Sequence, residues 1–213
     1  MEPDLPANPL SVELTFSHRR LWWQAGHGSR PERCEVSADV WQHDVVPDGL
    51  RHVGDISLVL TDAAQNLDTA QSVVLGEWVP RFLREAVADR EERRLEPALE
   101  AAISPGPALV VIVRRIRLAE PWQGHGLGVA ILASSLRSLS RIARMAICRP
   151  LPADFAAEGA DAVSAERNAV RAVATLERIG FWRWRGVHVI DLRSRSLLDA
   201  RTELLHRWWP KGG

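Results

Sequence analysis

Residues 108–128 read ALVVIVRRIRLAEPWQGHGLG, and this stretch decides the fold of the chain. Its first six residues are aliphatic and mostly β-branched, which is typical of a strand buried on both faces, and the strand is expected to continue to Leu118. A loop with glycines at 124, 126 and 128 follows, and an apolar helical pattern begins at Leu127. This order favours a phosphate site, because glycines let the backbone approach a phosphate and the first helical amides point outward.

The spacing of the glycines excludes the two commonest phosphate motifs. A P-loop requires GxxxxGK[ST], and the only lysine of the chain is Lys211. The dinucleotide fingerprint requires GxGxxG, whereas Gly124, Gly126 and Gly128 are spaced as GxGxG. The loop therefore belongs to neither class.

The same loop does match the Q/R-x-x-G-x-G/A pattern of the Gcn5-related N-acetyltransferases, through Gln123, Gly126 and Gly128. A second mark of that family is a helix that ends in Gly-Phe before a strand, and Gly180-Phe181 occurs in this context. The two motifs stand in the expected order, so the chain resembles the family over about residues 108–192. The first hundred residues match it only in their order of strands.

The resemblance implies a single-domain α/β (α+β) fold. We expect a central, twisted, mostly antiparallel sheet that is splayed in the middle and flanked by helices on both faces. Residues 1–10 are expected to form a disordered tail, and residues 11–209 the domain. Within it, 11–107 would shape the acceptor side, 108–192 would bind acyl-CoA, and 193–209 would form a C-terminal helix.

Hydrophobic periodicity predicts the other elements. Alternation predicts strands at 11–16, 35–43, 55–60, 145–148, 181–184 and 187–192. Helical spacing predicts one long helix over 77–103, or two joined near Pro97, and further helices over 127–142, 164–179 and 196–208. Ser164 is the expected N-cap of the third, and the arginines at 137, 141 and 144 suit the end of the second.

What the family does with these residues gives a set of expected roles. The amides of Gly124, His125, Gly126, Leu127 and Gly128 would hold the CoA pyrophosphate, with Gln123 supporting the loop. The backbone of Ile116 and Leu118 would pair with the pantetheine arm like an added strand. The amide of Leu118 would polarise the thioester carbonyl as an oxyanion donor. The acceptor amine would attack directly, without a covalent enzyme intermediate.

One departure from the family concerns the proton donor. Members often carry a tyrosine several residues before Gly-Phe, but this chain has no tyrosine, and Leu176 occupies the slot. A thiol with a pKa of about 8.5 can leave without protonation. The general base is equally open: Glu120 and His125 flank the loop, although an exposed loop histidine without a catalytic role is the simpler interpretation of His125.

Composition narrows the partners. The chain is 46% hydrophobic and 25% charged with a net charge of zero, and no apolar run approaches about 20 residues, which argues against membranes and nucleic acid. The acidic, proline-containing start does not look like a secretory signal, so we expect a cytoplasmic protein with reduced thiols. His18, His27, His43 and His52 lack ligand spacing, so no metal is expected. The expected partner is an amine acceptor, which is either a small molecule or a protein. A homodimer is a further candidate.

Other interpretations remain open at this point. The donor could be an acyl-carrier protein or an aminoacyl-tRNA instead of acetyl-CoA or another acyl-CoA, or the domain could be a non-catalytic CoA-binding regulatory module. Arg114, Arg115 and Arg117 either recognise an acidic acceptor or CoA phosphates, or are exposed where the strand leaves its neighbour. Trp122 and Cys148 are expected to be packing residues.

Overall fold

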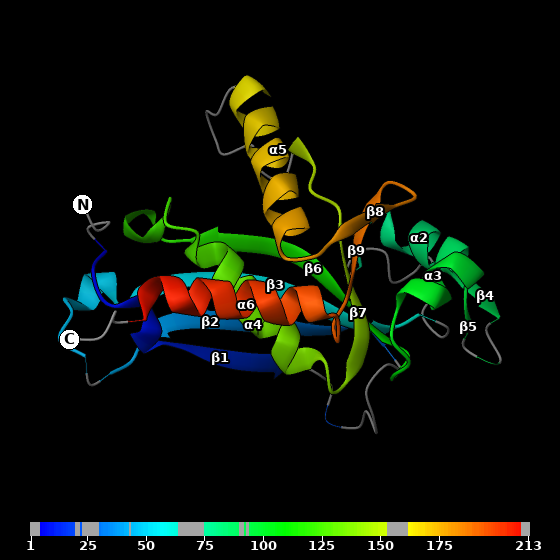
Figure 1. Cartoon of the computed structure of the whole chain (residues 1–213), viewed down its shortest axis with the longest axis horizontal. Coiled ribbons are helices and arrows are strands. Elements are labelled where there is room, and N and C mark those ends of the chain that lie inside the picture. Colours follow the sequence, from blue (N-terminus) through cyan, green and yellow to red (C-terminus); the bar gives the residue numbers. More distant parts are fainter. Residues whose placement is uncertain are drawn as a thin grey trace.

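The structure of the chain is a computed structural model that describes residues 5–19, 22, 30–42, 44–63, 75–89, 92, 94–152 and 162–209. These residues form one mixed α/β domain around a seven-stranded sheet with the strand order β1-β2-β3-β6-β7-β9-β8 (Figure 1). Only β6 and β7 are parallel, and every other neighbouring pair is antiparallel. The expected mostly antiparallel sheet is therefore confirmed.

The described elements run from a short 3₁₀ helix, η1, to a long helix, α6, near the end of the chain. The strands are β1 Val12–Arg19, β2 Glu32–Val40, β3 His52–Asp62, β4 Val87–Asp89, β5 Arg94–Leu95, β6 Leu109–Leu118, β7 Ala143–Cys148, β8 Trp182–Trp184 and β9 Val187–Asp191. The helices are η1 Pro9–Ser11, η2 Asp48–Leu50, α2 Val79–Ala86, α3 Pro97–Ala102, η4 Glu120–Trp122, α4 Leu127–Leu139, α5 Ala162–Arg178 and α6 Arg195–Trp208.

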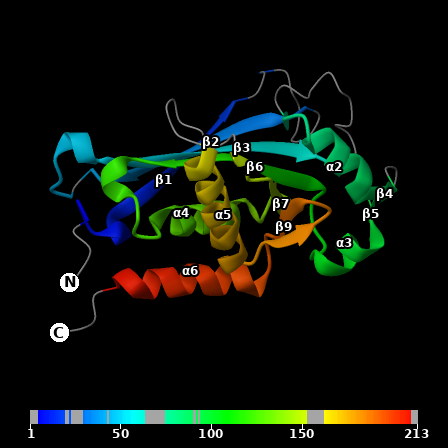
Figure 2. The same ribbon diagram turned by 90° about the horizontal axis from the view of Figure 1, so that it is seen from above.

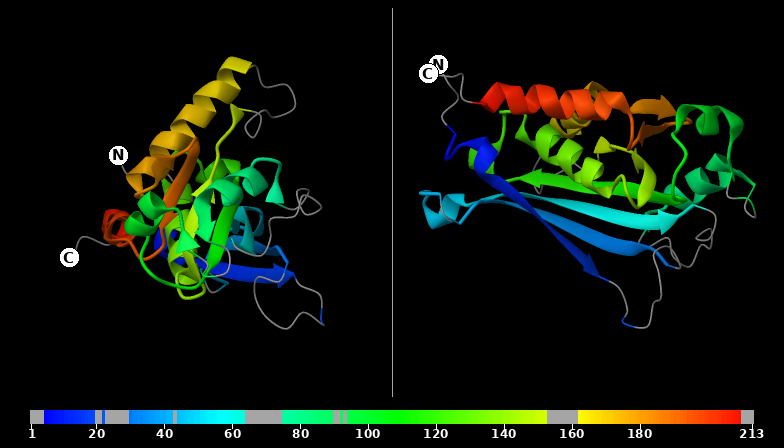
Figure 3. Two further views of the ribbon diagram at one scale, coloured as in Figure 1. Left: turned by 90° about the vertical axis from the view of Figure 1, so that its right-hand side faces the viewer. Right: turned by 60° about the horizontal axis from the view of Figure 1, so that its bottom comes forward.

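Each face of the sheet has its own hydrophobic core. Ile56, Leu58 and Leu60 of β3 face the core that α4 and α6 complete, while Val59 belongs to the core beneath α2 and α3. Figures 2 and 3 show α4 and α6 on one side of β1, β2 and β3. Because a strand sends successive side chains to opposite faces, the apolar runs of β3 and β6 serve both layers at once.

The helix predicted over 77–103 is wrong in its middle. The segment forms α2, a two-stranded hairpin from β4 and β5, and then α3. Val87 pairs with Leu95 across the hairpin. The carboxylate of Glu96 then accepts from the amides of Ala98 and Leu99 and caps α3, which has Pro97 in its first turn. Charges that fit the polar face of a helix also fit an exposed hairpin, so periodicity alone could not separate the two.

Two further boundaries differ from the prediction. Helix α5 begins at Ala162, so Ser164 lies inside its first turn and is not the N-cap. Helix α4 ends at Leu139, and Arg144 is a buried residue of β7 whose Nη2 donates to Glu100 Oε1 at 2.8 Å. The predicted turn at Gly180 is confirmed, since its φ of +101° is left-handed.

Gly54 fixes how closely β3 approaches β6. A Cβ at this position would overlap the carbonyl oxygen of Arg117 and lie 2.9 Å from Cα of Leu118. Both atoms are backbone and cannot rotate away. We expect Gly54→Ala to lower the free energy of unfolding by about 1–3 kcal/mol, measured by urea denaturation. Gly49→Ala, where no atom lies within 4 Å, is the matched control, and an equal loss in both variants would contradict the prediction.

Candidate functional site

The central feature of the site is a fork between β6 and β7. Strand β6 pairs with β3 along its length, from Leu109 to Leu118, but with β7 only from Leu109 to Ile112. A register shift leaves Arg114 as an extra residue on β6, between the pairs Leu58–Val113 and Ser57–Arg115. Within the described chain, the β7-facing edge of residues 113–118 therefore has no strand partner.

Burial changes at the same point. Residues 109–113 are buried, residues 114–117 are exposed, and Leu118 is half-buried. The arginines of this strand are thus exposed where it leaves its neighbour, as one of the two interpretations expected, and their recognition of an anion stays a prediction. Arg114 also donates from Nη1 to the carbonyl of Leu75 at 2.8 Å, so its side chain turns toward the segment that leads into α2.

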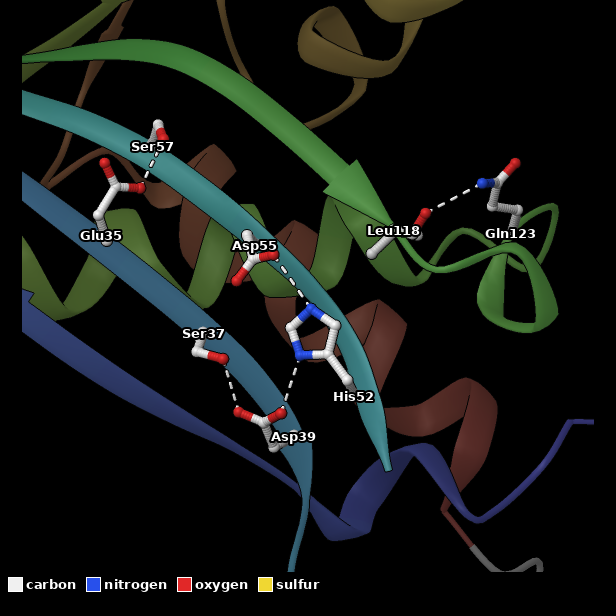
Figure 4. Close-up of polar contacts among 8 residues, drawn as sticks. All are labelled: Glu35, Ser37, Asp39, His52, Asp55, Ser57, Leu118 and Gln123. Atoms are coloured by element: carbon white, nitrogen blue, oxygen red, sulfur yellow. Dashed lines mark hydrogen bonds and ion pairs between the residues drawn. The ribbon is translucent and has the colours of Figure 1, made fainter. Parts of the chain in front are cut away.

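The glycine loop joins the open end of β6 to α4. Trp122 at its base is completely buried, and its indole Nε1 donates to the carbonyl of Leu50 at 3.1 Å. Gln123 donates from Nε2 to the carbonyl of Leu118 at 3.0 Å (Figure 4). The buried indole and the amide of Gln123 therefore hold the loop against the sheet, and Trp122 is confirmed as a packing residue.

Glycine is required at two places in this loop. Gly124 and Gly126 have φ angles of +83° and +78°, in the left-handed region that other residues rarely adopt. Gly126 is the N-cap of α4, and no side chain caps that helix. The first amides of α4 thus lack a helical acceptor and a capping group, which leaves them available to an anion.

The predicted catalytic residues lie at the loop end of β6. Glu120 is exposed, His125 is half-buried, and a Cβ on Gly128 would be 3.4 Å from Cδ1 of Leu118. From Leu118 to Val113 an extended strand spans about 16 Å. The structure therefore brings Leu118, Gln123 and the loop amides together, and separates them from the closed end of the fork.

A cysteine and a histidine lie at that closed end; the sequence predicted only a packing role for Cys148 and none for His188. Cys148, half-buried, follows the last residue of β7 that pairs with β6, and it pairs with His188 of β9. His188 is 7% exposed, and its Nδ1 has no hydrogen-bond partner among the described residues. Burial lowers the pKa of His188, so its imidazole is neutral near pH 7. A histidine within the apolar run 187–190 was the available signal.

The face of the sheet opposite α4 is polar beside the fork (Figure 4). The ring of His52 bridges two carboxylates, with Nδ1 at 2.9 Å from Asp39 and Nε2 at 3.0 Å from Asp55. Asp55 pairs in register with Arg117 of β6. Acidic and basic side chains of three strands thus lie next to the unpaired part of β6. The bridge was invisible in the sequence because its members meet across strands.

His52 makes stability depend on pH. Its pKa is raised above 6.5, chiefly by the hydrogen bond to Asp39, while desolvation opposes the shift and Asp55 adds to it. Because the folded pKa is the higher one, the stabilisation is complete below about pH 6.5 and is lost as pH rises through the folded pKa. The side chain is 49% exposed, so the effect is small, about 0.5 kcal/mol.

The test compares His52→Gln with the wild type. We expect the loss of unfolding free energy, measured by urea denaturation, to be larger at about pH 6 than at about pH 9. An equal loss at both pH values, or a larger one at the higher pH, would contradict the assigned ion pairs.

Other residues that the sequence singled out lie outside the fork and the glycine loop. Leu176, in the tyrosine slot, is buried in the core beneath α4. Cys34 is a free, buried thiol whose pKa is raised to about 11 by burial, and its Sγ lies 3.6 Å from Nε2 of His18. His27 and His43 lie outside the described residues.

Among the described residues there is no cluster of three potential metal ligands. None of the described helices combines the length and the apolar character that crossing a bilayer requires.

Comparison with known proteins adds no relative. No protein-family model matches the chain, and no curated protein matches it. The geometry of the fork and the loop therefore carries the functional argument.

Proposed function

We propose that the chain has the fold of the Gcn5-related N-acetyltransferases and transfers an acyl group, most simply acetyl, from acyl-CoA to a primary amine by direct attack. One observation carries the proposal: within the described chain, the unpaired edge of β6 leads from the fork to a loop with two left-handed glycines and then to a helix without a side-chain cap. An unpaired strand edge can take up an extended amide-containing chain. An uncapped helix N-terminus can take up a phosphate. Acyl-CoA carries both groups in that order.

The loop would bind the pyrophosphate through its backbone. The amides from Gly124 to Gly128 are the donors, and Gly124 has no atom within 4 Å of a built Cβ, so a phosphate can approach it closely. Gln123 would act indirectly, because its side-chain amide is already used on the carbonyl of Leu118. The backbone of Ile116 and Leu118 would pair with the pantetheine arm.

The length of β6 shifts the expected position of the thioester. Leu118 packs beside Gly128, so it lies next to the pyrophosphate in this arrangement. An arm that extends along the open edge would bring the thioester toward Val113 and Arg114, about five residues farther in. We therefore place the oxyanion donor in the bulged backbone at Arg114, in place of the Leu118 amide predicted from the sequence.

The same placement bears on the general base. Glu120 and His125 would lie beside the phosphates and away from the attacking amine. His188 is a neutral imidazole close to the closed end of the fork, which makes it the better candidate for a proton acceptor. No described residue takes the place of the missing tyrosine at Leu176, so the thiolate would leave unprotonated or take its proton from water.

Calorimetric titration of the purified chain with acetyl-CoA and with free CoA tests the donor. Release of CoA thiol with a panel of primary amines then tests transfer. Binding and amine-dependent thiol release are expected. Binding without release on any amine would favour the non-catalytic CoA-binding module. Failure to bind acetyl-CoA, CoA or longer acyl-CoAs would contradict the proposal and favour a carrier-protein or aminoacyl-tRNA donor.

A further inference from the structure

A cavity lies between α4, α6 and β1. It has a volume of about 740 Å³, which is within the range of small-molecule sites, roughly 300–1,000 Å³. We call it the α4–α6 groove. Figures 1 and 3 show α4 and α6 side by side, running in roughly opposite directions, with β1 beneath them. The lining residues named below all belong to the part of the chain that the structure describes.

The two ends of the α4–α6 groove differ in chemistry. The end near the start of α4 is apolar: Leu127 and Ile131 of α4 face Leu205 and Trp208 of α6, with Leu10 of η1 beside them. Val12 and Leu14 of β1 line the groove as well, and both are only half-buried. Apolar side chains that remain partly open at the rim of a core mark a surface that can still bury area.

The other end is cationic. It contains Arg137 in the last turn of α4, Arg141 in the turn after α4 and Arg201 in the middle of α6, together with Ser138 and Ser140. None of the described residues that line the groove is an aspartate or a glutamate. Three like charges around one cavity repel each other unless an anion lies among them.

The three arginines of the groove make few hydrogen bonds or ion pairs with the described residues. Arg137 donates from Nη1 to the carbonyl of Leu192 at 3.3 Å. Within the described residues, Arg141 and Arg201 have no hydrogen-bond or ion-pair partner. The dipole of α4 favours basic residues at its C-terminus and accounts in part for Arg137 and Arg141. It does not account for Arg201, which lies in the interior of another helix.

We propose that the α4–α6 groove is a binding site for an aliphatic carboxylate, such as a medium- or long-chain fatty acid. The carboxylate would lie among Arg137, Arg141 and Arg201, because guanidinium groups match its planar shape. The chain would lie along Leu14 and Val12 toward Leu127 and Trp208. The site does not depend on the proposed acyltransferase activity.

Titration calorimetry with decanoate, decanol and acetate tests the site. Decanoate is expected to bind at least about tenfold more tightly than decanol, because it alone carries the charge. It should bind at least about a hundredfold more tightly than acetate, because it alone carries the aliphatic body. The double variant Arg141→Gln/Arg201→Gln should lose at least about tenfold in decanoate affinity.

Two controls make the result specific. Arg195→Gln removes a charge from α6 at an exposed residue that is 3.9 Å from Asp199 and outside the groove, and it should bind decanoate like the wild type. Gly126→Glu should also retain decanoate binding, because the groove shares only Leu127 with the glycine loop and its arginines lie elsewhere. Thermal unfolding of each variant establishes that it is folded.

Several outcomes would overturn the proposal. These are equal binding of decanoate and decanol, unchanged affinity in the double variant, or loss of decanoate binding in Gly126→Glu, which would assign it to the loop. If the wild type is a dimer that does not bind decanoate, and the double variant is a monomer, the groove is instead a contact with a second copy of the chain.

Discussion

Gly126→Glu is expected to weaken the binding of acetyl-CoA by at least about a hundredfold, close to 3 kcal/mol. The substitution places a carboxylate where the pyrophosphate would bind, so like charges meet at short range. It also forces a side chain onto a backbone with a φ of +78° at the N-cap of α4. The measurement is calorimetric titration of wild type and variant under identical conditions.

The backbone strain needs its own control. Gly186→Glu imposes the same substitution at a φ of +81°, in the turn between β8 and β9 and with no atom within 4 Å. Strain at a left-handed position costs about 1–2 kcal/mol, so both variants should lose similar stability. Only Gly126→Glu should lose acetyl-CoA. If the wild type binds acetyl-CoA and the two variants bind it with equal affinity, the pyrophosphate does not bind at this loop.

Trp122→Ala is expected to lower the free energy of unfolding by about 3–5 kcal/mol. The side chain is completely buried in the core beneath α4, and its truncation leaves a large cavity and an unpaired carbonyl at Leu50. Because Trp122 is the base of the glycine loop, acetyl-CoA binding should weaken as well, at temperatures where the variant is folded. Urea unfolding followed by circular dichroism measures the first effect.

Two variants separate the contributions of Trp122. Trp122→Phe keeps an aromatic ring but removes the donor to Leu50, and it should cost about 1–3 kcal/mol. Trp22→Ala changes a side chain that is 94% exposed and should cost less than about 0.5 kcal/mol. A loss in Trp122→Ala no larger than that in Trp22→Ala would contradict the burial of the indole.

The sequence predicted best where one local pattern has one physical solution. The β-branched run before Arg114 favours a buried strand, and the glycines at 124 and 126 favour a tight loop, so β6, the loop and the start of α4 were predicted correctly. The segment over 77–103 failed because its alternating charges suit a helix and a hairpin equally. The intrinsic helix propensity of this segment is only a weak constraint. The pairing of Val87 with Leu95 therefore determines that a hairpin forms in place of a helix.

The site was only partly predictable for a different reason. Residues close in sequence, such as Leu118 and Gln123, were expected together and lie together. His52 with Asp39, and Cys148 with His188, meet only through strand register. A shift of register by one residue would send these side chains to opposite faces, so no spacing in the sequence could reveal them.

The short parallel seam between β6 and β7 has a mechanical consequence. Among the described residues it joins one block of the sheet, β1-β2-β3-β6, to another, β7-β9-β8, through the pairs from Leu109 to Ile112 and one bridge from Ala108 to Ala143. Beyond Ile112 the described parts of the two blocks are held together by side chains of the two shared cores and not by strand pairing. A ligand that bonds to both blocks beyond Ile112 would add a third connection between them and is therefore expected to raise the thermal stability of the domain.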